Sequence, residues 1–270
     1  MTGRPLAELT TVVTSFAFRE EYIAELTGML TTIRRCHPGW PIVVGRGTPG
    51  GGDVVTFDVE SPLGQDRWTL PAPCRFGFGE DDWRRITRMK AWWLHEVWHR
   101  FGGLSGSVVH RTMWFDVDAR CNAPLVFELA PEAEIIAGPW WEHPTDRSYD
   151  GITTGLLLLQ GREDGPVGRA LARWSEACLE QIRNLAPPTV PWLESDQEVL
   201  TKVLAGWDEA DGDLEVLKLD HDTFCGIPSA DGTPPPEALI DHWMMSAKTR
   251  PGRRGPDWPP PEHLRRRERG

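Results

Sequence analysis

The first part of the chain alternates between two hydrophobic patterns that belong to different secondary structures. A short β-branched segment at residues 9–13 predicts a buried strand. The next segment places its apolar residues at helical spacing, and WPIVV at 40–44 predicts a second strand. A strand, a helix and a strand in this order form a βαβ unit, whose two strands run parallel with the helix on one face. The opening therefore predicts an α/β fold with a mostly parallel central sheet flanked by helices.

The same two periodicities predict the rest of the fold. Helices are expected at residues 81–101, at 167–185 and, in a shorter form, from Ser195 onward. Strands are expected at residues 111–115, 133–138, 155–160 and 215–219. The glycine-rich stretch 45–52 is expected to be a mobile loop, because glycine leaves the backbone unrestricted.

Length and composition limit the classes of protein to which the chain can belong. Its 270 residues suit a single domain, expected at 1–248, followed at 249–270 by a basic tail rich in proline and glycine. The net charge of −11 excludes a protein that coats nucleic acid non-specifically. The five cysteines show no C-x-x-C spacing, and no apolar run is long enough to span a membrane. We therefore expect a soluble, cytoplasmic protein with reduced thiols.

One predicted strand ends in two carboxylates. Residues 112–118 read TMWFDVD, so Asp116 and Asp118 directly follow an apolar strand. The carboxyl edge of a parallel sheet is where open α/β folds bind their ligands. Two carboxylates at that edge can hold a hard divalent cation and leave coordination positions for phosphate oxygens. A cation held there can neutralise the charge that develops on a departing nucleotide diphosphate.

Separated segments of the chain, in a fixed order, carry a resemblance to a known enzyme family. They are VVTSF at 12–16 with the helix after it, RRITRMKAWWL at 84–94 leading into TMWFDVDA at 112–119, TTGLLLLQ at 153–160 leading into SDQEVL at 195–200, and HWMMSAK at 242–248. With these motifs the chain resembles the GT-A nucleotide-diphosphosugar glycosyltransferases, and most closely glycosyltransferase family 8. The resemblance covers residues 9–250 and implies a GT-A, Rossmann-like fold whose Asp-x-Asp motif ends a central strand.

The resemblance also implies a role for each matching residue. Asp116, Asp118 and His242 are implied to hold the metal ion, Mn²⁺ or Mg²⁺. Asp196 and Gln197 are implied to face the sugar as catalytic residues. The residues implied to contact the nucleotide-sugar donor are Thr14, Ser15, Phe16, Arg85, Lys90, Asp116 and Lys248.

The implied reaction moves a sugar from a nucleotide-diphosphosugar, a UDP-sugar by expectation, to an acceptor hydroxyl with retention of anomeric configuration. Inversion would instead need a carboxylate base near the acceptor, for which Glu142, Asp146 and Asp150 are candidates. The acceptor stays open among a glycan, a small molecule, a protein and a hydroxylated DNA base. A non-catalytic binding module would have no need of the intact carboxylates at 116 and 118.

One motif supports a different class of enzyme. Residues 95–99 read HEVWH, which matches the H-E-x-x-H pattern of zinc metalloproteases on a predicted helix. His95 and His99 would share one helix face and bind zinc, with Glu96 as general base. The candidates for a third zinc ligand are Glu128, Glu132 and Glu134. A zinc metallohydrolase is therefore the alternative to the glycosyltransferase.

Overall fold

The structure is a computed structural model that describes residues 6–18, 20–49, 53–74, 80–128, 133–139, 152–184, 195–219 and 237–242. Its helices are α1 (Glu20–Cys36), α2 (Glu80–Phe101), α3 (Pro166–Arg183) and α4 (Asp196–Ala205), with 3-10 turns at Gly102–Ser105 and Glu209–Asp211. The main sheet contains β2 (Val12–Phe18), β3 (Ile42–Pro49), β4 (Val55–Ser61), β5 (Gly64–Thr69), β6 (His110–Phe115), β9 (Ala133–Pro139), β10 (Ile152–Gly161) and β11 (Glu215–Lys218). Two short pairs lie outside it, β1 (Leu6–Ala7) with β8 (Phe127–Glu128) and β7 (Ala119–Cys121) with β12 (Ile240–His242).

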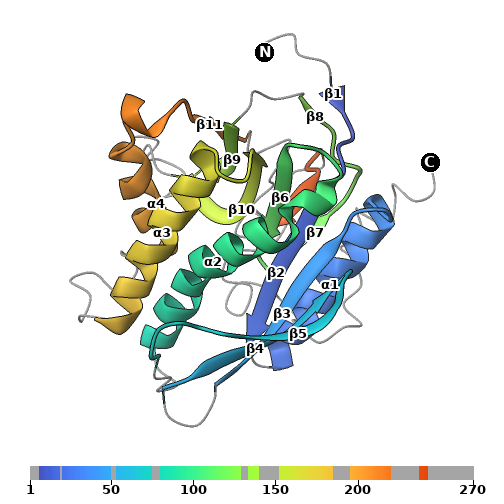
Figure 1. Cartoon of the computed structure of the whole chain (residues 1–270). Coiled ribbons are helices and arrows are strands. Elements are labelled where there is room, and N and C mark those ends of the chain that lie inside the picture. The colour runs from blue at the N-terminus through green and yellow to red at the C-terminus, as the bar shows by residue number, and fades with distance from the viewer. Residues whose placement is uncertain are drawn as a thin grey trace.

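The main sheet has the strand order β11-β9-β10-β6-β2-β3-β4-β5 (Figure 1). Strand β2 pairs in parallel with both β3 and β6, and β11 pairs in parallel with β9. The other pairings are antiparallel, so β4 and β10 run against the direction that the remaining strands share. The predicted α/β class, with a mostly parallel central sheet flanked by helices, is therefore confirmed. The carboxyl end of β6, where Asp116 and Asp118 follow, lies in the middle of this sheet.

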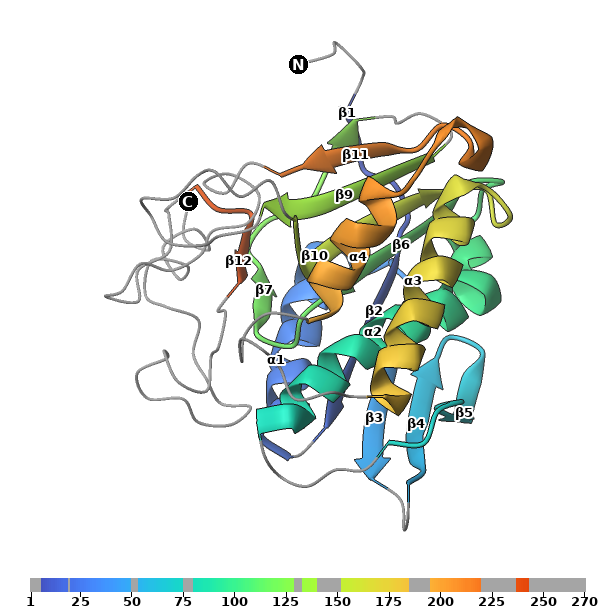
Figure 2. The same ribbon diagram turned by 90° about the vertical axis from the view of Figure 1, so that its left-hand side faces the viewer.

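Alternate residues of the strands face two separate hydrophobic cores. Val12 and Val43 pack with helices α2, α3 and α4 in one core, whereas Val13 and Val44 pack with α1 and β7 in the other. This is the period-two alternation of a strand whose two faces are both covered. Figures 1 and 2 show the same arrangement, with α2, α3 and α4 over one face of the sheet and α1 over the other.

The elements with strong periodicity lie where the sequence predicts them. The helices expected at 81–101 and 167–185 are α2 and α3, and the short helix after Ser195 is α4. Helix α3 begins at Pro166, whose fixed φ suits a first helical turn. Helix α4 begins with a capping box, in which the Ser195 side chain accepts from the Gln197 amide and the Glu198 carboxylate accepts from the Ser195 amide. The first strand is shifted, because it occupies Val12–Phe18 instead of residues 9–13.

The mobile loop predicted at 45–52 is wrong over its first half, because β3 continues to Pro49. Gly45 and Gly47 lie within that strand. A Cβ atom on Gly45 would stand 2.5 Å from the ring of Trp93, and one on Gly47 would overlap the ring of Phe18. These glycines therefore make room for aromatic rings that pack on the strand, and flexibility is not their role. Residues 50–52 lie outside the described part of the chain.

Three pairs of strands were not predicted. In the hairpin of β4 and β5, the second strand, GQDRWT, is polar apart from the buried Trp68 and shows no hydrophobic alternation. Strands β1 and β8 have two residues each, and β7 and β12 have three each, which is too short for a period to be recognised. The pair of β7 and β12 matters for function, because it carries His242.

His37, directly after α1, is a fully buried histidine that links three parts of the fold. Its Nδ1 lies 3.1 Å from a carboxylate oxygen of Glu8, and its Nε2 accepts a hydrogen bond of 2.9 Å from the Leu125 amide. Its ring stacks on Trp40, with 3.6 Å between the ring centroids. The bond from Leu125 requires an unprotonated Nε2, so the native state holds a neutral imidazole. Burial lowers the pKa of His37, and the Glu8 carboxylate opposes this only in part.

We expect this histidine to make the protein less stable in mild acid. The unfolded chain takes up the proton near pH 6.5 and the folded protein at a lower pH, so between these two pKa values the protein loses up to about 1.4 kcal/mol of stability per pH unit through His37. Urea unfolding at pH 7.5 and 5.5 measures the effect in the wild type and in His37→Gln, whose amide oxygen can accept from Leu125. The wild type should lose more stability than the variant between these two values. Equal losses would contradict the prediction.

Within the described residues, no helix has both the length and the apolar character needed to cross a membrane. Cys36, Cys74, Cys121 and Cys178 are free thiols. The basic tail at 249–270 lies outside the described part of the chain, so the division at residue 248 stays a prediction.

Candidate metal and donor site

Asp116 and Asp118 lie in the turn that joins β6 to β7. The turn closes through a hydrogen bond of 2.9 Å from the Ala119 amide to the Asp116 carbonyl. The Asp116 amide donates to the carbonyl of Gly155 on β10, which holds the turn against the neighbouring strand. Asp116 is about one-third exposed, and Asp118 is more buried. Both carboxylates therefore stand at the middle of the sheet edge where α/β folds bind ligands.

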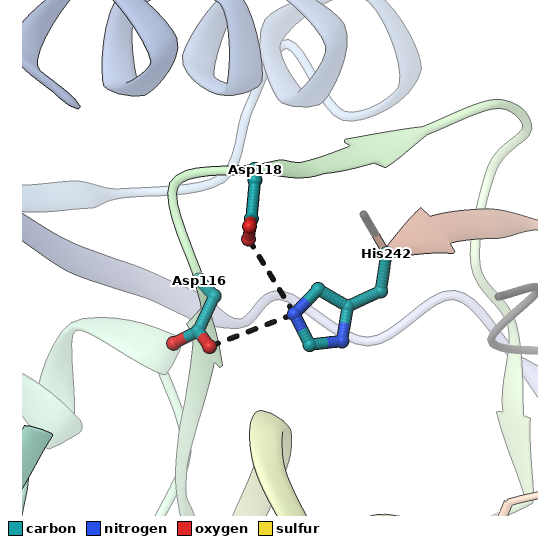
Figure 3. A group of neighbouring side chains, drawn as sticks. All are labelled: Asp116, Asp118 and His242. Carbon is teal, nitrogen blue, oxygen red and sulfur yellow. Dashed lines mark ion pairs between the residues drawn. The ribbon is translucent and has the colours of Figure 1, made fainter. Parts of the chain in front are cut away.

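His242 reaches this turn from a segment far along the chain. Strand β12 pairs antiparallel with β7, and this register sets His242 opposite Ala119. Its Nε2 lies 3.5 Å from Oδ2 of Asp116 and 3.4 Å from Oδ1 of Asp118, as Figure 3 shows. Within the described residues, these three side chains form the one group of at least three whose ligand atoms all lie within 4.8 Å of one another. Two carboxylates and an imidazole are a donor set that fits a divalent cation.

Gly155 provides the space that the His242 ring occupies. A Cβ atom at this position of β10 would overlap Cε1 of His242 and would stand 2.8 Å from both ring nitrogens. Any side chain at position 155 would therefore displace the imidazole from the two carboxylates. Glycine at position 155 therefore lets the His242 ring approach the two carboxylates.

Lys90 places a buried ammonium group behind the candidate metal ligands. Its Nζ lies 3.0 Å from Oδ1 of Asp116 and 3.3 Å from Oδ2 of Asp196. It also donates to Thr154, at 3.0 Å to the carbonyl and 3.2 Å to the hydroxyl oxygen. The lysine comes from the core-facing side of α2, where its cost of burial is offset by these acceptors. Lys90 thus joins the turn that carries Asp116 and Asp118 to the start of α4.

Asp196 is the buried end of this network. Its carboxylate accepts a hydrogen bond of 2.5 Å from the Thr154 hydroxyl, in addition to the contact with Lys90. Its carbonyl accepts a bond of 2.8 Å from the indole of Trp174 on α3. Gln197, the next residue, is half-buried on the first turn of α4. The structure therefore brings Asp196 to the site through Lys90 and Thr154.

The charges of this network shift one another's pKa values. Burial acts to lower the pKa of Lys90, but the carboxylates of Asp116 and Asp196 outweigh it and the pKa is raised. Burial acts to raise the pKa of Asp116, but Lys90, then His242 and Trp114, outweigh it and the pKa is well below its usual range. Burial dominates at Asp196, whose pKa is raised although Lys90 and Thr154 oppose the shift. At neutral pH the ammonium and the Asp116 carboxylate are both charged.

The predicted donor residues on β2 lie inside the core. The Thr14 hydroxyl donates to the Val43 carbonyl at 2.8 Å and accepts a bond from the Trp93 indole. The Ser15 hydroxyl donates at 2.7 Å to the Phe115 carbonyl, directly before Asp116. Phe16 is buried among aromatic rings. The two hydroxyls are thus already bonded within the sheet, and Ser15 braces the end of β6.

The remaining predicted residues are distributed unevenly. Arg85 is half-buried near the start of α2, whereas its neighbours Arg84 and Arg88 are buried on the core side of that helix. Lys248 lies outside the described residues. The loop carboxylates considered for inversion, Glu142, Asp146 and Asp150, lie there as well.

Trp114 is a site residue that the sequence analysis did not name. Its indole donates a hydrogen bond of 2.7 Å to Oδ1 of Asp116, and its ring lies 5.2 Å from the Lys90 ammonium. Residues two apart on a strand point to the same face, so the spacing of Trp114 and Asp116 could have indicated that their side chains meet. Trp114 therefore orients the carboxylate that Lys90 also holds.

The H-E-x-x-H segment has a different geometry from that of a zinc protease. Glu96, the required general base, is bound to Arg100 at 2.8 Å. Glu134 accepts a hydrogen bond from Gln160 in the sheet, and the side chains of the other predicted third ligands, Glu128 and Glu132, lie outside the described part. No described His, Cys, Asp or Glu completes a three-ligand group with His95 and His99. The protease alternative therefore has no support from the described residues.

Comparisons with known proteins add little to this geometry. No protein-family model matches the chain, and a search of curated proteins also finds no match. Among solved structures, the chain is similar to the galactosyltransferase LgtC in complex with donor and acceptor sugar analogs. The two chains share 13% identity over 87% of each, with a TM-score of 0.44. A likeness at this level carries no argument about activity.

Proposed function

We propose that this chain is a metal-dependent glycosyltransferase of the GT-A type, which moves a sugar from a nucleotide-diphosphosugar to an acceptor hydroxyl. One observation carries the proposal: Asp116, Asp118 and His242 converge at the carboxyl end of a central strand. These three residues come from two segments that the family resemblance pairs as the metal ligands. Their convergence supports the resemblance, because nothing in local sequence would bring residues 118 and 242 together.

The donor set supports Mn²⁺ over Mg²⁺. Carboxylates suit Mg²⁺ and Mn²⁺ alike, whereas an imidazole ligand suits the borderline transition metals better than Mg²⁺. Asp116, Asp118 and His242 would hold the ion through two oxygens and Nε2. When bound, the ion would neutralise charge on the diphosphate of the donor, which we expect to be a UDP-sugar.

The chain's own residues would position the ligands and keep their charges fixed. Lys90 and Trp114 both contact Oδ1 of Asp116, which leaves Oδ2 on the side of His242. Asp196 and Thr154 hold the Lys90 ammonium in place. In the proposed reaction Asp196 therefore acts as a positioning residue through Lys90, and Gln197 is the residue proposed to approach the sugar. We propose that the configuration at the anomeric carbon is retained, in line with the resemblance.

Donor hydrolysis and binding test this proposal. UDP-, GDP-, ADP- and TDP-sugars are incubated with the full chain and Mn²⁺, and free nucleotide diphosphate is measured. We expect one donor to be bound and slowly hydrolysed, and we expect EDTA to abolish the reaction.

Asp118→Asn should weaken Mn²⁺ binding at least tenfold, because one charged ligand becomes neutral. Asp58→Asn, at an exposed carboxylate on β4, is the matched control and should behave as the wild type. Metal-independent hydrolysis, or an unaffected Asp118→Asn, would contradict the proposal.

A further inference from the structure

His95 and His99 place two imidazole nitrogens face to face on α2. The Nε2 atoms lie 3.1 Å apart, and the rings are nearly perpendicular. A tetrahedral zinc ion with Zn–N bonds of about 2.0–2.1 Å would set two nitrogen ligands about 3.3 Å apart. The observed spacing is therefore close to that of a chelating pair, and His99 is about one-third exposed, so an ion can enter from solvent.

A carboxylate lies on the opposite side of His99. Oε1 of Glu163, in the turn between β10 and α3, lies 3.2 Å from Nδ1 of His99. A proton on Nδ1 donated to this carboxylate leaves the lone pair on Nε2, directed at His95. Histidine ligands of metals usually have such a carboxylate or carbonyl partner, which fixes the tautomer and the ring orientation.

The position of Glu163 is itself fixed by the fold. Its carbonyl accepts a hydrogen bond of 3.0 Å from the Trp98 indole on α2. The first turn of α3 closes over the same carbonyl, since a Cβ on Gly168 would overlap it. The fold therefore holds the two imidazole rings close together, with a fixed carboxylate behind His99.

From this geometry we infer that His95 and His99 form a second metal site, which binds Zn²⁺ or a similar borderline cation and is oriented by Glu163. Two protein nitrogens bind the ion, and water completes its coordination. Imidazole nitrogens favour zinc, copper and nickel over Mg²⁺ and Ca²⁺, so this site differs in preference from the carboxylate-rich group at Asp116. It is not a protease centre, because Glu96 is bound to Arg100.

The site is separate from the proposed donor site. His99 follows Lys90 by nine residues, which is about 14 Å along a helix axis. Both ligands belong to one helix, so binding tightens the C-terminal half of α2 and its contact with the turn at Glu163. The inference does not depend on the glycosyltransferase proposal, since it uses none of the same residues.

Zinc titration of the full chain tests the inference. Calorimetry is done in an Asp118→Ala background, which removes the other group of ligands. We expect one zinc ion to bind at neutral pH. His95→Ala or His99→Ala should raise the Kd at least tenfold, and Glu163→Ala should raise it by about tenfold, as for other outer-shell partners. Glu96→Gln is the matched control within the same motif and should change the Kd less than twofold.

A second measurement needs no substitution. Diethyl pyrocarbonate modifies exposed imidazole nitrogens, and mass spectrometry locates the products in the wild-type protein. Zinc should protect His95 and His99 from the reagent and leave His110 unprotected. The inference is overturned if zinc fails to protect these two rings, or if the His95→Ala, His99→Ala double variant binds zinc as tightly as its parent.

Discussion

Replacing Lys90 by methionine is expected to destabilise the folded protein by about 3 kcal/mol, which is the lower end of the cost of breaking a buried ion pair from one side. Methionine keeps most of the lysine's packing volume but removes the ammonium that stands between Asp116 and Asp196. The buried Asp196 carboxylate then keeps the hydrogen bond from the Thr154 hydroxyl but loses its contact with the ammonium. The pKa of Asp196 is raised, so the carboxylate can take up a proton in mild acid, and this reduces the cost of burying it without the ammonium. The loss of folding stability should therefore be larger at pH 8 than at pH 5.

Urea unfolding in EDTA measures this loss. A double-mutant cycle with Asp196→Asn isolates the ionic part, because the neutral amide needs no counter-charge. We expect Lys90→Met, Asp196→Asn to be more stable than Lys90→Met alone. Lys202→Met on the exposed side of α4 is the control and should stay within about 0.5 kcal/mol of the wild type. If Lys90→Met and the wild type unfold at the same midpoint concentration of urea, the ammonium does not stabilise this network.

Replacing Gly155 by alanine is expected to weaken Mn²⁺ binding by about a hundredfold, at the upper end of the effects of disturbing the residues around a metal site. The added methyl group would overlap the His242 ring, which must then leave the two carboxylates. Because the ring is buried, overpacking should also cost about 1–3 kcal/mol of stability. The affinity is measured by electron paramagnetic resonance of free Mn²⁺ at increasing protein concentration.

His242→Ala provides the discriminating background for this experiment. If Gly155→Ala acts by displacing the imidazole, it should have no further effect on Mn²⁺ affinity once the imidazole is gone. Gly39→Ala is the matched control, because a Cβ at that position meets no atom within 4 Å. A Gly155→Ala protein that binds Mn²⁺ as the wild type does would show that His242 is not a ligand in its present position.

The candidate site was only partly readable from the chain. Asp116 and Asp118 could be placed because they follow an apolar strand directly, and strand ends in α/β sheets are ligand edges. Lys90 stood out as a charged residue among apolar helix positions, but its partners did not, since Thr154 lies 64 residues after Lys90 and Asp196 lies a further 42 residues after Thr154. His242 could be proposed only through the family resemblance, because the three-residue strand that carries it has no readable pattern.

The glycine-rich stretch and the H-E-x-x-H motif show the same limit of sequence patterns. A glycine-rich stretch predicts a loop when only its backbone freedom is considered, yet Gly45 and Gly47 lie in β3 under the rings of Trp93 and Phe18. The H-E-x-x-H spacing put His95 and His99 on one helix face, as the structure has them. Spacing could not show that Glu96 binds Arg100 or that Glu163 supports His99.

Sequence by itself therefore determined the α/β class, the long helices, the strand that ends in Asp116 and the shared face of His95 and His99. Each of these depends on the period of one element, which local order along the chain expresses directly. Only the tertiary structure showed that His242 reaches the two carboxylates, which groups contact Lys90, and that the glycines leave room for neighbouring rings. These depend on which side chain meets which across strands and helices, and contacts between distant segments form only when the whole core packs.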